Sequence, residues 1–252
     1  MMPEPLRPAL LWPMMPERQR APGGQRHDGA APLIVAHRGA WGAAPQNSLE
    51  AFERAIALGC GGIEIDVRRT ADGRLAIVHD ARVGGRPVAR SQHRQIQARM
   101  KAGQAPLLEE VLDLVAGRLV LDVELKEDGY VAAVMATIAR RLTPDRYVVT
   151  SFRDPVLAQV KRCVPEARTG LLLGARLRLR ELDRRARQTG VDFLAPHVAL
   201  ASRGILHWAE ARELPTWLWT VNDPRLLRRL RADARVMAVV TDKPERALSI
   251  FA

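Results

Sequence analysis

From residue 31 onward, short runs of β-branched and aliphatic residues alternate with longer stretches of helical periodicity. The expected strands are 33–37, 62–68, 119–125, 147–151, 168–173, 191–195, 216–221 and 237–241. The expected helices lie near 47–58, 107–116, 129–141, 154–163, 178–189, 202–212, 223–232 and 244–251. Eight strands that alternate with eight helices predict an α/β fold, a (βα)₈ barrel, for which a chain of 252 residues has the usual length.

Several helix starts are marked by capping residues. Asn47 is followed three residues later by Glu50, which is typical of a capping box. Asp154-Pro155 and Asp223-Pro224 each place a capping residue before a proline at the first helical position. These signals support helices that begin near residues 47, 154 and 223.

The composition fits a globular chain with a large core. Hydrophobic residues make up 47% and charged residues 27% of the chain. No apolar run reaches about 18 residues, so no transmembrane helix is expected. A net charge of +11 favours an anionic partner such as a phosphate, a nucleic acid or a membrane surface. Two cysteines, Cys60 and Cys163, are too few for a disulfide framework, and we therefore expect a reducing, cytoplasmic location.

Residues 1–30 differ from the rest of the chain. They contain six prolines, show no apolar periodicity, and have no apolar stretch long enough for the hydrophobic region of a signal peptide. Such a composition does not bury enough apolar surface to become ordered. We expect a disordered or loosely docked tail over 1–30, dispensable for function, and one barrel domain over 31–252.

Acidic residues collect at the ends of two predicted strands, and the carboxyl ends of barrel strands form one mouth where functional residues lie. Glu64 and Asp66 are two residues apart on one strand and point to the same side of it, and Glu124 lies on the next barrel strand. Three inward carboxylates repel one another, and a hard cation such as Mg²⁺ or Ca²⁺ relieves that repulsion. Ion pairs with Arg68 or Lys126 are the alternative interpretation.

Two histidines accompany this acidic cluster. His37 ends the first strand, and His79 ends a short apolar segment that follows the second. With a reference pKa of about 6.5, one histidine can accept a proton from a nucleophile while the other gives one to a leaving oxygen. Arg38 offers a planar fork that suits a phosphate, and Lys126 offers a point charge. A metal ion, two cations and an acid/base pair together indicate phosphoryl transfer.

The segment between Asp66 and His79 predicts a β-hairpin excursion after the second strand, because a ninth parallel strand would overfill the barrel. Asp72-Gly73 is a strong signal for a two-residue turn. A hairpin centred on that turn places Asp66 directly opposite His79, with both side chains on one face. The excursion continues into residues 81–104, here called the basic segment, which we expect to form a rim beside the mouth. It contains no Asp or Glu and carries Arg82, Arg86, Arg90, Arg94, Arg99 and Lys101.

Short motifs follow one another in a fixed order along the chain. They are His37-Arg38-Gly39, Pro45-Gln46-Asn47-Ser48, Glu64-x-Asp66, Thr70-Ala71-Asp72-Gly73, His79-Asp80, Glu124-Leu125-Lys126, Ser151-Phe152, Trp219-Thr220-Val221-Asn222 and Thr241-Asp242-Lys243-Pro244. Each motif is weak alone. Their joint order and spacing, over residues 33 to about 248, resemble the glycerophosphodiester phosphodiesterase family.

The resemblance implies a TIM barrel that hydrolyses glycerophosphodiesters to glycerol 3-phosphate and an alcohol. It implies a divalent cation, Mg²⁺ or Ca²⁺, bound by the carboxylates of Glu64, Asp66 and Glu124. It also implies catalysis by two histidines, with His37 as the base and His79 as the acid. By analogy with the family, the glycerol hydroxyl next to the phosphate attacks phosphorus, and water then opens the cyclic product.

The expected substrate- and phosphate-binding residues are Arg38, Lys126, Asn47 and Trp219. For Trp219, contact with glycerol and packing at the barrel top remain equally open. One departure from the family pattern is Gln46, where the family usually has Glu, so any ion pair of that position with Arg38 is in doubt. The position is not expected to bind the metal.

Alternative functions come from the same residues. A lysophospholipase-D-type phosphodiesterase would use the same machinery on lysophospholipids, with weak peripheral contact to an anionic membrane. A catalytically inactive barrel that binds anions or nucleic acid is the alternative from another class. Against it, both histidines and all three carboxylates are present, and no nucleic-acid motif occurs. The expected partner is therefore a small-molecule substrate.

Overall fold

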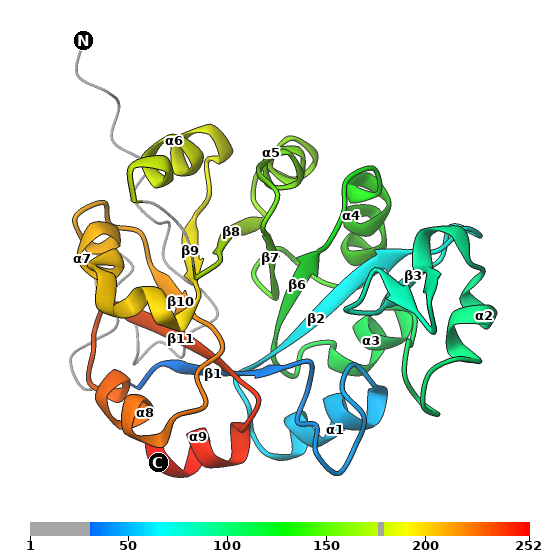
Figure 1. Ribbon diagram of the computed structural model, residues 1–252, viewed down its shortest axis with the longest axis horizontal. Coiled ribbons are helices and arrows are strands. Elements are labelled where there is room, and N and C mark those ends of the chain that lie inside the picture. The colour runs from blue at the N-terminus through cyan, green and yellow to red at the C-terminus, as the bar shows by residue number, and fades with distance from the viewer. Residues whose placement is uncertain (1–30, 176–178) are drawn as a thin grey trace.

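A computed structural model describes residues 31–175 and 179–252 (Figure 1). In this part of the chain, eight parallel strands form a closed ring, because β1 pairs with both β11 and β2. In chain order they are β1 (Leu33–His37), β2 (Gly62–Arg69), β6 (Val120–Leu125), β7 (Tyr147–Ser151), β8 (Arg168–Leu173), β9 (Phe193–Pro196), β10 (Thr216–Leu218) and β11 (Val236–Thr241). The predicted (βα)₈ TIM barrel is confirmed.

Helices surround the ring of strands on its outer side (Figure 1). They are α1 (Leu49–Ala57), α3 (Leu108–Val115), α4 (Val131–Ala139), α5 (Asp154–Cys163), α6 (Leu179–Thr189), α7 (Ile205–Glu210), α8 (Pro224–Arg231) and α9 (Pro244–Phe251), with the 3-10 helix η3 (Val198–Arg203) before α7. None of the helices in residues 31–175 and 179–252 has the length and apolar character of a membrane-crossing segment. The predicted tail over 1–30 lies outside the described residues.

The barrel interior is filled by side chains rather than open. Its central cluster includes Val35, Val148, Trp217 and Phe193, all at most 1% exposed. Gly170 on β8 makes room for this packing, because a Cβ atom at that position would lie 2.2 Å from the Phe193 ring. The filled interior holds the strand ends in fixed positions, which a preorganised site requires.

Two of the three expected helix caps are corrected. Ser48, not Asn47, caps α1, and its Oγ accepts from the Ala51 amide at 3.2 Å. Asn47 adopts a positive φ of 54°, and its side chain turns away from the helix to donate to Asp66. Asp154 is the first residue of α5 and pairs with Arg185 instead of capping. Asp223 does cap α8, as predicted.

The excursion after β2 is a hairpin, but the predicted register is wrong by one residue. β3 (Leu75–Ile77) runs antiparallel to β2, and the Val78 amide donates to the Asp66 carbonyl at 2.8 Å. Val78, not His79, therefore lies opposite Asp66. The cause is a three-residue turn, in which the Gly73 amide donates to the Thr70 carbonyl while Gly73 takes a left-handed φ of 77°.

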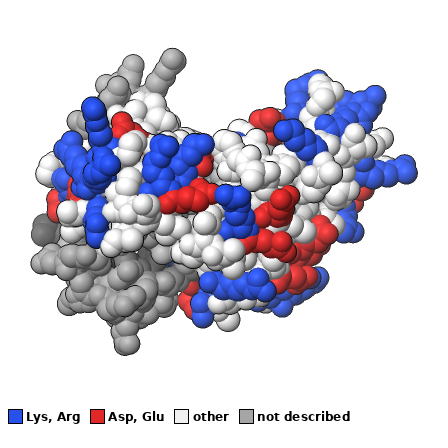
Figure 2. Space-filling view, turned by 90° about the horizontal axis from the view of Figure 1, so that it is seen from below, with Lys and Arg blue, Asp and Glu red and all other residues white. Residues whose placement is uncertain are grey.

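The excursion then folds into a small layer of its own, which the sequence did not predict in detail. It contains β4 (Arg82–Val83), β5 (Arg86–Pro87), the 3-10 helix η2 (Val88–Arg90) and α2 (His93–Gln97). These elements pack over a small apolar cluster formed by Ala76, Val78, Val83, Val88, Ile96 and Ala105. Figure 2 shows Lys and Arg side chains gathered at the same end of the molecule, and all six basic residues of the basic segment are exposed. The basic segment is thus a structured, positively charged projection.

Candidate active site

Three buried carboxylates meet at the carboxyl end of the barrel. Glu64 and Asp66 come from β2 and Glu124 comes from β6, where the register places Asp66 beside Glu124. Each offers an oxygen atom, and these atoms lie within 4.8 Å of one another. Glu64, Asp66 and Glu124 are only 5%, 0% and 8% exposed, respectively. The predicted cluster is therefore present as one group, with little access to solvent.

Two cations and one amide surround this cluster. Lys126 Nζ lies 2.6 Å from Asp66 Oδ1 and 2.6 Å from Glu124 Oε1. Arg38 Nε lies 3.1 Å from Asp66 Oδ2, and the Asn47 side-chain amide donates to the same oxygen at 2.8 Å. The ion pair with Lys126, raised as an alternative to a metal ion, is thus formed. The pair with Arg68 is not, because Arg68 binds the Glu127 carboxylate and the His79 carbonyl.

Gln46 holds Arg38 in place without a charge. The Gln46 side-chain oxygen accepts from Arg38 Nη1 at 3.0 Å, and Gln104 in turn donates to the Gln46 carbonyl. Gln46 therefore still contacts Arg38, through a hydrogen bond from the charged guanidinium to a neutral amide oxygen instead of an ion pair. Arg38 remains aligned along Asp66.

The electrostatics of the three carboxylates differ. Burial, reinforced by Asp66 and Glu124, raises the pKa of Glu64 well above its usual range. Burial also raises the pKa of Glu124, although Lys126 opposes it. Burial acts in the same direction on Asp66, but Lys126 and Arg38 outweigh it and lower the pKa of Asp66 to about 2. Added positive charge at this site would thus be most favourable near Glu64 and Glu124.

Two oxygen atoms in this group have neither a hydrogen bond nor an ion pair among the described residues. They are Glu64 Oε1 and Asn47 Oδ1, and both atoms are buried. Buried polar atoms are nearly always paired, so unpaired oxygens beside a carboxylate cluster call for a cation. Oxygen donors of this kind suit Mg²⁺ or Ca²⁺, so the cluster is able to bind a divalent cation.

His37 lies at the end of β1 between two acidic side chains. Its Nδ1 atom is 2.7 Å from Asp242 Oδ1, and its Nε2 atom is 3.9 Å from Glu64 Oε2. Asp242 follows β11 and is held by the Asn222 side-chain amide, which donates to Asp242 Oδ2 at 2.7 Å. Asp242 belongs to one of the motifs in the sequence, but no role was predicted for it. Its signal is its position after the last strand, which neighbours the first in a closed barrel.

His79 lies at the rim of the same mouth. Its Nδ1 atom is 2.8 Å from Asp80 Oδ1, and its side chain is 40% exposed. Burial lowers the pKa of His79, and the nearby Lys126 and Arg38 act in the same direction, while Asp66 opposes them. Although the predicted hairpin register is wrong, His79 is therefore close enough to the carboxylate cluster and its cations for their charges to affect its pKa.

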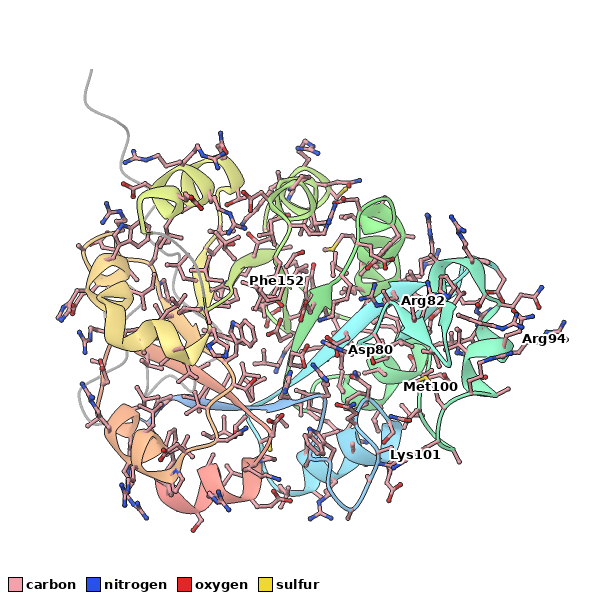
Figure 3. The ribbon with its side chains drawn as sticks, viewed as in Figure 1. Asp80, Arg82, Arg94, Met100, Lys101 and Phe152 are labelled. Carbon is pink, nitrogen blue, oxygen red and sulfur yellow. The ribbon has the colours of Figure 1, made fainter. Side chains whose placement is uncertain are left out.

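A cavity of about 210 Å³ connects His79 to the cluster. Its lining includes Glu124, Lys126, Phe152 and Arg153. Figure 3 shows Phe152 near the centre of the ring of strands and Asp80 on the side of the ring that faces the excursion, whereas Arg94 lies at the outer end of the excursion. The cavity thus opens at the mouth, beside the start of the basic segment.

Aromatic rings form one side of the mouth. Among the described residues, Phe152 is the one large hydrophobic residue that is exposed to solvent, with an exposed fraction of 43%. Its ring packs edge-on against Trp219 at 5.5 Å, and Trp219 packs edge-on against His197 at 5.0 Å. Trp219 donates its indole N–H to the Ala195 carbonyl. The Trp219 side chain is therefore anchored at the barrel top, next to an exposed aromatic face.

Comparison with known proteins decides the family. The model of the glycerophosphoryl diester phosphodiesterase family matches residues 37–246. The chain belongs to this family. Membership confirms the predicted family and the enzyme class, a phosphoric diester hydrolase.

Individual relatives match over most of their length. The glycerophosphodiester phosphodiesterase of Caldanaerobacter subterraneus subsp. tengcongensis is 26% identical over 238 residues, which cover 86% of this chain and 97% of the relative. A Mycobacterium tuberculosis protein, named "Probable glycerophosphodiester phosphodiesterase 2", is 30% identical over 242 residues, or 87% and 90% of the two chains. The fold matches the crystal structure of a glycerophosphodiester phosphodiesterase from Thermotoga maritima with a TM-score of 0.75, at 23% identity over 87% and 98% of the two chains.

Proposed function

We propose that this chain hydrolyses glycerophosphodiesters to glycerol 3-phosphate and an alcohol, with a divalent cation held by Glu64, Asp66 and Glu124. The observation that carries the proposal is the buried three-carboxylate cluster, with its unpaired Glu64 oxygen, directly beside His37. Membership of the family and the names of the relatives support the substrate class. Either Mg²⁺ or Ca²⁺ satisfies this ligand set.

The cation, when bound, supplies Lewis acidity to a phosphoryl oxygen of the substrate. The side chains of this chain supply the remaining chemistry. Arg38 and Lys126 carry fixed positive charge next to the cluster and would orient the phosphodiester through its other oxygens. Asn47 would also contact the substrate, because its unpaired side-chain oxygen can accept a hydrogen bond from a substrate hydroxyl.

Proton transfer is assigned to the two histidines. His37 Nε2 takes the proton from the glycerol hydroxyl next to the phosphate, and the resulting oxygen attacks phosphorus. The phosphorus–oxygen bond to the alcohol breaks, and His79 gives its proton to the leaving oxygen. Water then opens the cyclic phosphate, with His79 as base and His37 as acid, so both histidines return to their first protonation states. The exposed position of His79 on the rim suits contact with a leaving group of variable size.

Lysophospholipids are the second candidate substrate class. Two features beside the mouth favour it. The exposed ring of Phe152 would contact the apolar acyl chain, and the basic segment would attract an anionic membrane surface. Contact with a membrane would be weak and peripheral, and would rest on the charges of the basic segment.

Product analysis separates these candidates. Purified protein with Mg²⁺ or Ca²⁺ is incubated with glycerophosphocholine and, in parallel, with lysophosphatidylcholine, and released glycerol 3-phosphate and choline are measured enzymatically. We expect equal amounts of glycerol 3-phosphate and choline from the first substrate. Choline release from lysophosphatidylcholine but not from glycerophosphocholine would assign the lysophospholipase-D activity. No product from either substrate, or from a panel of other glycerophosphodiesters, would refute the proposal.

A further inference from the structure

His37 is held from the side opposite the carboxylate cluster. Its Nδ1 atom faces Asp242 Oδ1 at 2.7 Å, while Nε2 faces Glu64. The side chains of His37 and Asp242 are only 18% and 21% exposed, so water competes little for this contact. The contact joins the last strand of the barrel to the first.

Asp242 is itself fixed by Asn222. The Asn222 Oδ1 atom accepts from the Asp242 amide at 2.9 Å and from the Thr241 hydroxyl at 3.0 Å. Because two donors occupy the oxygen, the amide group cannot turn over, and its Nδ2 must face Asp242 Oδ2, at 2.7 Å. The Asp242 carboxylate therefore has one oxygen for Asn222 and one for His37.

We propose that Asp242, clamped by Asn222, is a positioning residue that keeps the proton of neutral His37 on Nδ1 and leaves the Nε2 lone pair facing the carboxylate cluster. An ionised carboxylate only accepts hydrogen bonds, so the 2.7 Å contact requires a proton on Nδ1. The hydrogen bonds from His37 and Asn222 outweigh burial and lower the pKa of Asp242, which favours the ionised form. The inference rests on the proposed function, in which Nε2 of His37 is the base.

Replacing this carboxylate by an amide would have a specific consequence. In Asp242→Asn, the fixed Nδ2 of Asn222 still needs an acceptor, so the introduced amide presents its oxygen to Asn222. Its NH₂ group then faces His37 and donates to Nδ1. The proton of His37 moves to Nε2, and the base is lost although the ring stays in place. Loss of the correct tautomer by such a change lowered turnover about 10⁴-fold in serine proteases, and changes to groups that orient metal-site residues cost about 10–100-fold.

Steady-state kinetics test the positioning role. We expect Asp242→Asn to lower kcat on glycerophosphocholine at least about tenfold, with KM changed less than about twofold, because in the proposed reaction the substrate hydroxyl meets the His37 ring and not Asp242. The matched control is Asp113→Asn, which removes one exposed carboxylate that pairs with Arg141 and should leave kcat unchanged. In the His37→Ala background, Asp242→Asn should cause no further loss. An equal loss with and without His37, or no loss at all, would overturn the inference.

The tautomer can be measured without activity. In protein labelled with ¹⁵N-histidine, the His37 ring signals are assigned by their absence in His37→Ala, which also serves as the spectroscopic control. We expect a protonated Nδ1 in the unchanged protein and a protonated Nε2 in Asp242→Asn. The same tautomer in both proteins would refute the inference. An inactive unchanged protein with the expected tautomers would instead refute the proposed function and leave the positioning intact.

Discussion

Glu64 and Asp66 are two residues apart on one strand, yet their surroundings shift their carboxyl pKa values in opposite directions. Asp66 is paired with Lys126 and Arg38, whereas one oxygen of Glu64 has no partner in the described residues. The sequence predicted this cluster because alternation along a strand places both side chains on one side. It did not predict the Asp242 contact to His37, since that pair joins residues 205 positions apart and exists only once the barrel closes.

Glu64→Gln is expected to abolish metal-dependent turnover while the fold survives. A neutral amide is a poor ligand for a hard cation, and Glu64 is the carboxylate with most to gain from one. The measurement is kcat at saturating Mg²⁺ or Ca²⁺, beside a thermal unfolding curve. Glu245→Gln, at an exposed pair with Arg54, is the control and should keep full activity. An unchanged kcat in Glu64→Gln would contradict the ligand assignment.

His37→Ala and His79→Ala are each expected to lower kcat by roughly 10²–10⁴, the range for removal of a general acid or base. His207→Ala is the matched control, because that side chain is 78% exposed on the outer surface and outside the cavity. The comparison uses glycerophosphocholine at saturating metal. A loss below tenfold in either variant would demote that histidine to a packing role.

Asp122 lies deeper in the barrel, beside Glu64 in the register, and burial raises its pKa to about 7. The folded state therefore keeps this proton at pH values where the unfolded state, with a pKa near 3.9, has lost it. The protonated Asp122 therefore contributes stability below about pH 4, and this contribution is lost progressively as the pH rises to about 7. Above that range the folded state bears the full free-energy cost of a buried, ionised Asp122. Asp122→Asn keeps the acceptor for the Thr150 hydroxyl and removes this cost.

Urea unfolding in EDTA at pH 5 and pH 8 measures the effect. From pH 5 to pH 8, the free energy of unfolding should fall more in the unchanged protein than in Asp122→Asn, by about 2–3 kcal/mol. Parallel pH dependence in the two proteins would show that the Asp122 pKa is not raised.

Among the elements, the excursion separates what a local pattern can predict from what it cannot. Asp72-Gly73 correctly marked a reversal of the chain, but the same dipeptide serves two-residue and three-residue turns. With Gly73 in a left-handed conformation, the turn is three residues long, and Val78 instead of His79 lies opposite Asp66. The small layer after β3 escaped prediction because its strands are only two residues long and its helix only five.

The basic segment is expected to attract anionic substrates to the mouth. For a net anionic glycerophosphodiester such as glycerophosphoglycerol, kcat/KM should fall with rising salt, because salt screens exposed charges. Replacing Arg82, Arg86 and Arg90 by Gln should weaken that dependence. The control replaces three exposed arginines on α8, which are Arg225, Arg228 and Arg229. Equal salt dependence in all three proteins would leave the basic segment as a solvated surface without a role in attraction.

At the scale of the whole molecule, the alternation of strand and helix patterns was sufficient to predict the closed barrel. Ring closure then brings chain segments far apart in the sequence, β1 and β11, into register. We propose that the mouth of this barrel is a metal-dependent phosphodiesterase site built from three buried carboxylates.

The most direct test is the rate of glycerol 3-phosphate release from glycerophosphocholine by protein stripped with EDTA, as Mg²⁺ or Ca²⁺ is added back. The rate should be near zero without metal and should rise to saturation with one of the two cations, whereas Glu64→Gln should stay near zero at every concentration. The same rate with and without EDTA in the unchanged protein would contradict the proposed metal dependence.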